Sequence, residues 1–144
     1  MTFQVGENFK DGVYFTVSSA GAPQGSKRHV GKGVMIEMSK RVAPFRVLAA
    51  KAARAAMGDR PPLRGAVQVY VRFSFVRPPS VTDRVWPHKG GPGDVDKLQR
   101  SLFDALTTAA VWGDDSQVCI VTAMKLYAPE GEPASVQVRV TPLE

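Results

Sequence analysis

The sequence has little of what stabilises secreted proteins or anchors membrane proteins. Its 144 residues include a single cysteine, Cys119, so no internal disulfide can form. The N-terminus lacks a basic start followed by an apolar stretch of signal-peptide length. No apolar run approaches the roughly 20 residues that a membrane-spanning helix needs. These absences predict a soluble cytoplasmic protein with no membrane partner.

Residues that carry zinc or nucleophilic chemistry are also scarce. The two histidines, His29 and His88, stand 59 positions apart, and neither has a cysteine or histidine at ligand spacing. This pattern argues against a zinc site, because structural and catalytic zinc need three or four such ligands. Cys119 falls in the apolar segment VCIV, which predicts a buried strand residue and not a nucleophile.

What is present is the composition of an ordinary globular domain. Hydrophobic residues make up 44% and charged residues 22% of the chain, and no internal repeat or long linker interrupts it. We therefore expect one domain over residues 1–144, large enough to bury a core without a structural metal.

Charge is distributed unevenly along the chain. Residues 27–89 contain 14 Lys and Arg against 3 Asp and Glu, although the whole chain carries only +6. Five aspartates then fall within residues 94–115. A cationic surface beside a compact acidic cluster is typical of a polyanion-binding protein that uses a divalent cation. The alternative is a solvated basic surface with aspartates that only cap helices and turns.

Hydrophobic periodicity predicts an α/β or α+β domain with a mixed sheet of about four to five strands and two main helices. Pro44 suits the first turn of a helix and Gly58 suits its C-terminal cap, so one helix is expected over residues 44–57, with Phe45 and Leu48 on its apolar face. The other helix is expected to follow Asp96. The predicted strands cover residues 12–18, 34–38, 66–76, 118–127 and 134–141.

The acidic run has two parts, one on each side of the second predicted helix. Asp94 and Asp96 precede about 13 helical residues, which separate them by about 20 Å from Asp114 and Asp115. The two parts can converge only if the following strand returns beneath the helix. Converging carboxylates would be hard oxygen ligands suited to Mg²⁺ or Mn²⁺. The alternative is that one of the first pair is simply a helix cap.

This run resembles a known family. DVDKLQRSLFDALTTAAVWGDDSQV is similar to the core motif of the RusA family of Holliday junction resolvases, D-x-D-N-L-x-K, a helix with D-A-L, and a W/Y-x-D-D-x-Q-V turn. The segment PQGSKRH also resembles the basic P-x-G-x-x-R loop of phage-type members. The resemblance implies a single RusA-like domain and a homodimeric endonuclease, phage or prophage encoded, that nicks four-way DNA junctions symmetrically with Mg²⁺, or Mn²⁺ as a substitute.

The resemblance also implies roles for individual residues. The catalytic, metal-binding carboxylates would be Asp94, Asp96 and Asp115, with Arg100 at the family's basic position. Asp114 would be an outer-sphere or turn residue, and Asp104 is expected to pair with Arg100. Two positions depart from the pattern: Lys97 stands where the family has Asn, and Arg100 stands where it has Lys. Arginine can neutralise phosphate but cannot donate a proton near neutral pH.

Basic residues in and after the PQGSKRH segment, in the loop of residues 77–93 and in the acidic motif would contact DNA. Trp86 or Phe103 could wedge into the junction centre. Two other functions stay open: a metal-dependent nuclease for flaps or other branched DNA, and a non-catalytic junction-binding module. The predicted DNA contacts are Lys27, Arg28, Lys32, Arg84, His88, Lys89 and Lys97.

Overall fold

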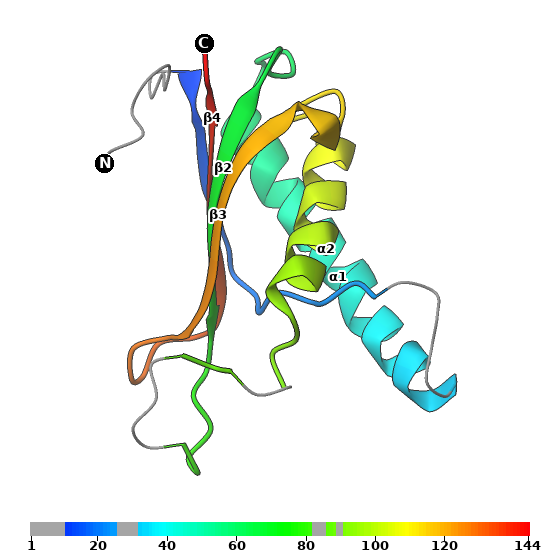
Figure 1. Cartoon of the computed structure of the whole chain (residues 1–144), viewed down its shortest axis with the longest axis vertical. Helices are drawn as coiled ribbons and strands as arrows, with labels where there is room; N and C mark the ends of the chain where they lie inside the picture. Colours follow the sequence, from blue (N-terminus) through cyan, green and yellow to red (C-terminus); the bar gives the residue numbers. More distant parts are fainter. Residues whose placement is uncertain (1–10, 26–31, 82–85, 89–90) are drawn as a thin grey trace.

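Four strands form one mixed sheet whose spatial order is β1-β4-β2-β3, and two long helices lie on one of its faces (Figure 1). The computed structural model describes residues 11–25, 32–81, 86–88 and 91–144, and for residues 32–39 the backbone alone. The predicted α+β domain with a mixed sheet and two helices is confirmed. The elements are β1 (Val13–Val17), α1 (Lys32–Met57), β2 (Val67–Phe75), α2 (Val95–Thr108), the 3-10 turn η2 (Asp115–Gln117), β3 (Val118–Tyr127) and β4 (Ser135–Pro142).

The centre of the sheet is β2, which pairs in parallel with β3 and antiparallel with β4. Its alternating sequence sends one set of side chains toward the helices and the other set to the uncovered face. The helix-facing set is buried, as the alternation predicts, and consists of Val67, Val69, Val71, Phe73 and Phe75.

Helix α1 is longer than the sequence predicts. Residues 34–38, expected to form a strand, belong to α1, and Pro44 lies inside the helix and not in its first turn. Proline removes one backbone donor, yet the 26-residue helix continues on both sides of Pro44. Gly58 has a φ of +57°, which confirms the predicted glycine cap. Leu48 is exposed, so the apolar face of α1 is narrower than expected.

Helix α2 packs its apolar face on the sheet. Its buried residues are spaced by three and four positions, as an amphipathic helix requires. Burial of each of its three buried leucines contributes about 1.5–3 kcal/mol. Phe103 meets Trp112 edge-on, with ring centroids 5.4 Å apart. The buried residues of α2 are Leu98, Ser101, Leu102, Ala105 and Leu106.

Strand β3 lies at the edge of the sheet (Figure 1). Among the described residues it pairs only with β2, so its outer edge carries unpaired backbone groups. Cys119 is exposed on this strand, so the expectation that it lies in the core is wrong. The pairing between β2 and β3 shifts its register between Val118 and Ile120, so Cys119 has no partner residue on β2 at this point of the edge strand.

Within the described part of the chain, no helix is long and apolar enough to cross a membrane.

Candidate functional site

The turn before α2 is held by two distant segments of the chain. Gly93 has a φ of +95°, and a Cβ atom there would lie 2.7 Å from the ring of Pro23. The carbonyl oxygen of Gly93 accepts a hydrogen bond of 2.8 Å from Nζ of Lys125 on β3. Only glycine fits this combination of backbone angle and close contact. The first acidic pair therefore follows an anchored turn.

Asp94 occupies the N-cap position of α2 without capping it. Its backbone is extended, at φ −79° and ψ 144°, and its side chain accepts no capping hydrogen bond. Its carboxylate is 67% exposed and lies 3.4 Å from Nζ of Lys97. Asp96 follows in the first turn and is exposed, where the helix dipole favours a negative charge. Asp94 therefore does not act as a cap, and both carboxylates are accessible to a cation.

Asp115 lies at the opposite end of the sheet. Helix α2 has 14 residues and is therefore about 21 Å long. Strand β3 runs back beside it, and the seven steps from Val118 to Lys125, whose side chain reaches Gly93, span about 23 Å. Both lengths place Asp115 about 20 Å from the acidic pair. In agreement with this separation, the described residues contain no group of three or more acidic, histidine or cysteine side chains that could hold a metal ion. One chain thus does not bring Asp115 to Asp94 and Asp96, and the three-ligand assignment stays a prediction.

Asp114 stabilises the turn that precedes β3. Its side chain accepts a hydrogen bond of 3.1 Å from the backbone of Ser116, while the side chain of Gln117 accepts one from the backbone N–H of Gly113. Gln117 also donates to the carbonyl oxygens of Leu63 and Gly65. The hydrogen bonds from Ser116 lower the pKa of the Asp114 carboxyl below its ordinary value. Asp114 is thus a capping residue of the turn, one of the two roles expected for it.

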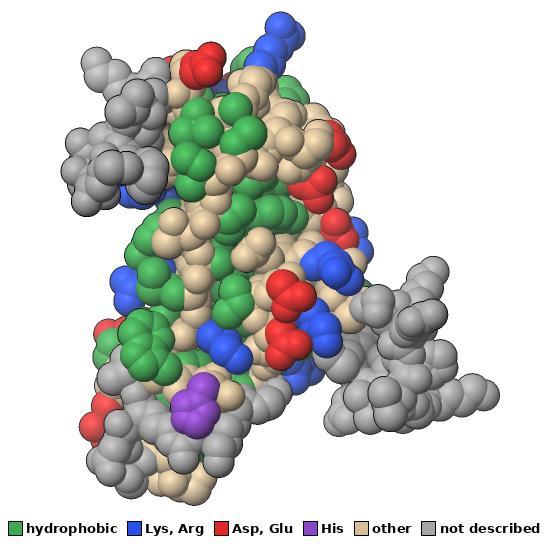
Figure 2. Space-filling model, viewed as in Figure 1, with side chains coloured by type: hydrophobic (Ala, Val, Ile, Leu, Met, Phe, Trp, Pro, Cys, Tyr) green, Lys and Arg blue, Asp and Glu red, His purple; other side chains and the backbone are tan. Residues whose placement is uncertain are grey.

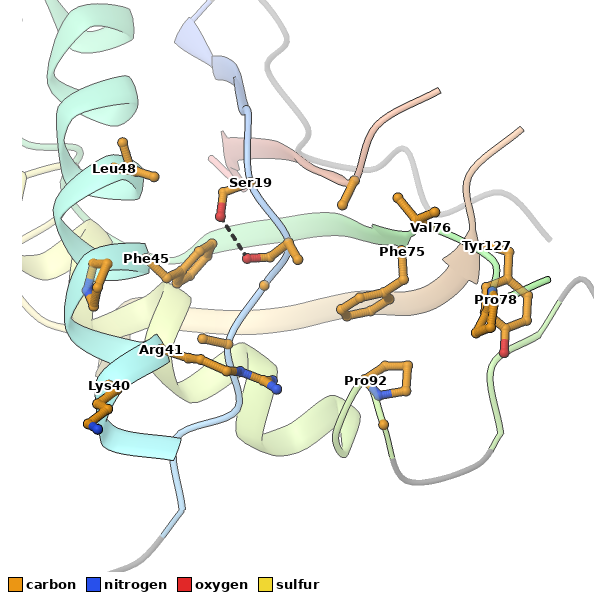
Figure 3. Close-up of a pocket in the computed structure, with 16 residues that line it drawn as sticks. Ser19, Lys40, Arg41, Phe45, Leu48, Phe75, Val76, Pro78, Pro92 and Tyr127 are labelled. Carbon is orange, nitrogen blue, oxygen red and sulfur yellow. Dashed lines mark hydrogen bonds between the residues drawn. The ribbon is translucent and has the colours of Figure 1, made fainter. Parts of the chain in front are cut away.

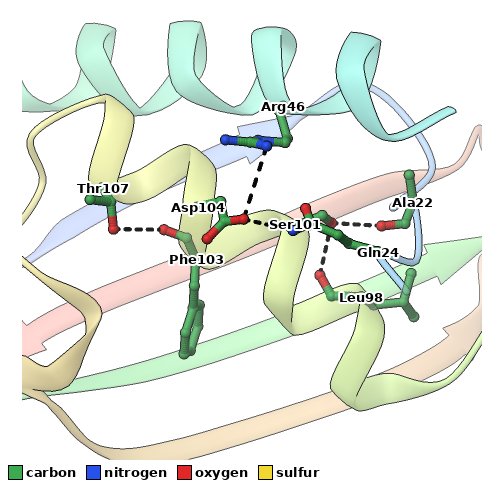
Figure 4. A network of polar contacts seen from close by, with 8 residues as sticks. All are labelled: Ala22, Gln24, Arg46, Leu98, Ser101, Phe103, Asp104 and Thr107. Carbon is green, nitrogen blue, oxygen red and sulfur yellow. Dashed lines mark hydrogen bonds and ion pairs between the residues drawn. The ribbon is translucent and has the colours of Figure 1, made fainter. Parts of the chain in front are cut away.

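Asp104 does not pair with Arg100, contrary to the sequence expectation. Its carboxylate accepts a hydrogen bond of 2.8 Å from Nε2 of Gln24 and lies 4.0 Å from Arg46 on α1 (Figure 4). The backbone N–H of Gln24 also donates to the carbonyl oxygen of Lys97. The reason is packing: α1 and the segment after β1 both lie against this face of α2, so Asp104 finds partners outside its own helix.

The segment after β1 is a structural part of the site that the sequence analysis did not identify. Ser101 donates a buried hydrogen bond of 2.6 Å to the carbonyl oxygen of Ala22 (Figure 4). Together with Gln24 and Pro23, this contact holds residues 21–24 along the first half of α2. The PQGSKRH motif predicts DNA contact, whereas the described part of this motif packs on α2.

The predicted DNA contacts have separate outcomes. Lys97 lies beside Asp94, and Arg100 and His88 are exposed. Lys32 is the first residue of α1. Figure 2 shows acidic and basic side chains side by side on one face of the molecule, next to apolar surface. The remaining predicted contacts lie outside the described residues: Lys27, Arg28, Arg84 and Lys89.

The two wedge candidates are distinguished by their burial. Phe103 packs against Trp112, which in turn donates a hydrogen bond of 2.8 Å to Thr107, so Phe103 belongs to the structural framework. Trp86 is 58% exposed and is the candidate that can reach DNA.

An apolar pocket of about 680 Å³ opens beside the anchored turn (Figure 3). It lies between α1, the segment after β1 and the ends of β2 and β3. Phe45, Phe75 and Tyr127 contribute rings to its wall, and Lys40 and Arg41 line it from α1. Its wall also includes Gly91 and Pro92, just before the acidic pair.

The chain matches the model of a known protein family over most of its length. The model of a family described as Endodeoxyribonuclease RusA matches residues 18–141. This range includes both helices, both halves of the acidic motif, β2, β3 and all of β4 except its last residue, whereas β1 precedes it. No match was found among curated proteins.

Proposed function

Because the chain belongs to the RusA endodeoxyribonuclease family, we propose that it cuts four-way DNA junctions by divalent-metal-dependent hydrolysis, as a homodimer. The observation that carries this proposal is the acidic pair at the start of α2. Asp94 and Asp96 are exposed, Asp94 makes no capping hydrogen bond, and the turn that precedes them is anchored by Pro23 and Lys125. Unneutralised carboxylates would repel DNA, so their exposure on a protein of net charge +6 supports a bound cation.

The residues around this pair suit phosphate chemistry. Mg²⁺ or Mn²⁺, held by the carboxylates, would activate the attacking water and offset charge on the scissile phosphate. Arg100 lies one helical turn after Asp96 and is exposed, so its guanidinium can bind a phosphate oxygen with two donors. Lys97 balances the charge of Asp94 at 3.4 Å. The residues therefore fit a metal-dependent phosphodiesterase, but one chain supplies only two of the three predicted ligands.

A second copy of the chain can supply the third ligand. Four-way junctions are two-fold symmetric and need two cuts, which suits a two-fold symmetric dimer. In such a dimer, the end of one protomer that carries Asp115 can lie beside the partner's acidic pair. We propose that each metal site combines Asp94 and Asp96 of one protomer with Asp115 of the partner subunit.

The open edge of β3 is the surface that suits this arrangement. It is ten residues long, contains no proline, and includes Val121, which is 38% exposed. Such an edge favours pairing with another strand. A two-fold axis at Val121 would place residue 115 of one chain opposite residue 127 of the other, since both lie six positions from the axis. Residue 127 lies two positions beyond Lys125, which contacts Gly93, so this register brings the partner's Asp115 toward the acidic pair.

Mixing two inactive variants tests both the activity and the shared site. Asp96→Asn and Asp115→Asn should each bind a synthetic four-way junction in Ca²⁺ but fail to cut it in Mg²⁺. If sites are shared, a mixed dimer has one site with both substitutions and one intact site. The mixture should therefore regain single nicks. If each site lay within one chain, every site of the mixed dimer would carry one substitution and the mixture would stay inactive.

The same assay decides between kinds of substrate. The wild type is expected to make paired, symmetric nicks in a four-way junction and to cut three-way and flap DNA poorly. Preferential cleavage of flaps would replace the junction proposal with a flap nuclease. Tight binding without cleavage in either Mg²⁺ or Mn²⁺ would show a non-catalytic binding module.

A further inference from the structure

Lys125 occupies a position where the sheet otherwise has apolar side chains. It pairs in register with Phe73 of β2, and this row of the sheet faces the helices. Phe73 is fully buried, as are Val69 and Val71 in the same face. Lysine is rarely placed inward unless its ammonium group has a partner and its stem can pack. The position of Lys125 therefore indicates that its ammonium group has a specific partner on the helix side of the sheet.

The ammonium group of Lys125 makes a specific contact. It donates a hydrogen bond of 2.8 Å to the carbonyl oxygen of Gly93, the residue before Asp94. The side chain is partly buried, so water competes less for this hydrogen bond than at an exposed site. An ammonium donor to a carbonyl is charge-assisted and stronger than a neutral pair.

This contact acts on the catalytic carboxylate through the backbone. The carbonyl group of Gly93 and the N–H group of Asp94 belong to one planar peptide unit. A hydrogen bond that fixes the carbonyl oxygen of Gly93 therefore also restrains the orientation of the peptide plane that leads into Asp94. Since the side chain of Asp94 makes no capping hydrogen bond, its direction depends on this backbone and on the ion pair with Lys97.

We propose that Lys125 is a positioning residue of the cleavage reaction, which fixes the Gly93–Asp94 peptide and thereby aims the Asp94 carboxylate at its cation. This inference rests on the proposed function. It also links the site to the sheet edge, because Lys125 lies on β3, the strand proposed to pair with the partner. Pro23 holds the other side of the same turn, at the position where a Cβ on Gly93 would collide with it.

The test compares Lys125→Met, which keeps the apolar stem and removes the donor, with Lys125→Arg, which keeps a donor. Lys51→Met is the matched control, because Lys51 is an exposed lysine of α1 away from this turn. Two readouts are needed: kcat and KM for cleavage of a four-way junction, and amide hydrogen exchange of residues 94–98 without metal.

Misplacing a catalytic group by about 1 Å can cost on the order of 100-fold in rate, so Lys125→Met should lower kcat by about that factor. KM should change by less than about threefold, because a positioning residue contributes little to ground-state binding of DNA. Lys125→Arg should recover at least about tenfold of the lost kcat, since arginine supplies a donor of similar reach. Exchange at the start of α2 should become faster in Lys125→Met and stay unchanged in Lys51→Met.

Three results would overturn the inference. One is a kcat of Lys125→Met close to that of the wild type. Another is a loss confined to KM, which would make Lys125 a DNA contact. The third is faster exchange across the whole sheet, which would make its role purely structural. If the wild type cuts no branched DNA, the proposed function fails, and the exchange measurement still decides whether Lys125 holds the turn.

Discussion

The side-chain amide of Gln24 donates a hydrogen bond of 2.8 Å to the carboxylate of Asp104, and this bond joins residues 80 positions apart in the sequence. It attaches the segment after β1 to the middle of α2. The same segment carries Pro23, which lies against Gly93, so one short stretch of chain contacts both α2 and the turn before the acidic pair.

Removing the Asp104 carboxylate should destabilise the protein. A hydrogen bond to a charged group contributes about 2 kcal/mol, so we expect Asp104→Ala to lower the free energy of unfolding by about that amount in urea titrations. The control is Arg46→Met. Its ion pair with Asp104 is 4.0 Å long and both side chains are partly exposed, so its loss should cost less than about 0.5 kcal/mol. Equal effects of the two changes would contradict the importance of Gln24.

Gly93 should not tolerate a side chain. Its φ of +95° is unfavourable for alanine, and the added Cβ would meet Pro23 at 2.7 Å. Gly93→Ala should cost about 1–3 kcal/mol of stability and slow junction cleavage. Gly91→Ala is the control, because no atom lies within 4 Å of its added Cβ and its φ is not in the left-handed region. Thermal unfolding of both variants measures the difference, and an unaffected Gly93→Ala would show that the turn is not anchored as described.

Substitution of the two candidate wedge residues, Phe103 and Trp86, should affect different properties of the protein. Phe103→Ala removes the edge-on contact with Trp112 and should cost about 3 kcal/mol of stability. Trp86→Ala should leave stability within about 0.5 kcal/mol of the wild type, because Trp86 is exposed. If Trp86 stacks on a junction base, its loss should weaken junction binding about tenfold or more in Ca²⁺. Unchanged binding would exclude a wedge at this position.

Asp114 should make stability depend on pH in the acid range. Its pKa is lowered in the folded protein by the hydrogen bonds from Ser116, from an ordinary value of 3.8. A lowered pKa means that the ionised form stabilises the fold above the unfolded-state pKa, and that this contribution is lost as the pH falls through the folded-state pKa. With metal chelated, Asp114→Asn should therefore be less stable than the wild type at pH 6 and converge with it well below pH 3.8. A difference that is constant over this range would assign the effect to packing.

The sequence predicts most of the sheet correctly but places the start of α1 too late in the chain. The alternation of apolar and polar residues over residues 66–76 predicts a strand with one buried face, and this strand forms the centre of the sheet. The segment VMIEM fits a strand as well as a helix, and Pro44 looked like a helix start, so α1 was predicted too short. Cys119 was expected to be buried because an apolar segment does not reveal that it forms an edge strand or that its register shifts at this residue.

The site was predictable only in part. The motif placed Asp94 and Asp96 at the start of a helix, as found. Lys125 could not be found from the sequence, because it lies 32 positions from Gly93 and the two meet only in the folded chain, at the end of β3 where it pairs in parallel register with β2. The separation of Asp115 from the acidic pair follows from the same register.

In the proposed dimer, the length of strand β3 would set the distance between the two cuts. Its ten residues span about 33 Å, and in the proposed dimer one metal site lies near each end of the paired strands. The spacing between the two scissile phosphates would then be set by a rigid ladder of backbone hydrogen bonds and not by a flexible linker. Shortening β3 by two residues would preserve which side chains face the helices, yet bring the two cuts about 7 Å closer along the strand direction.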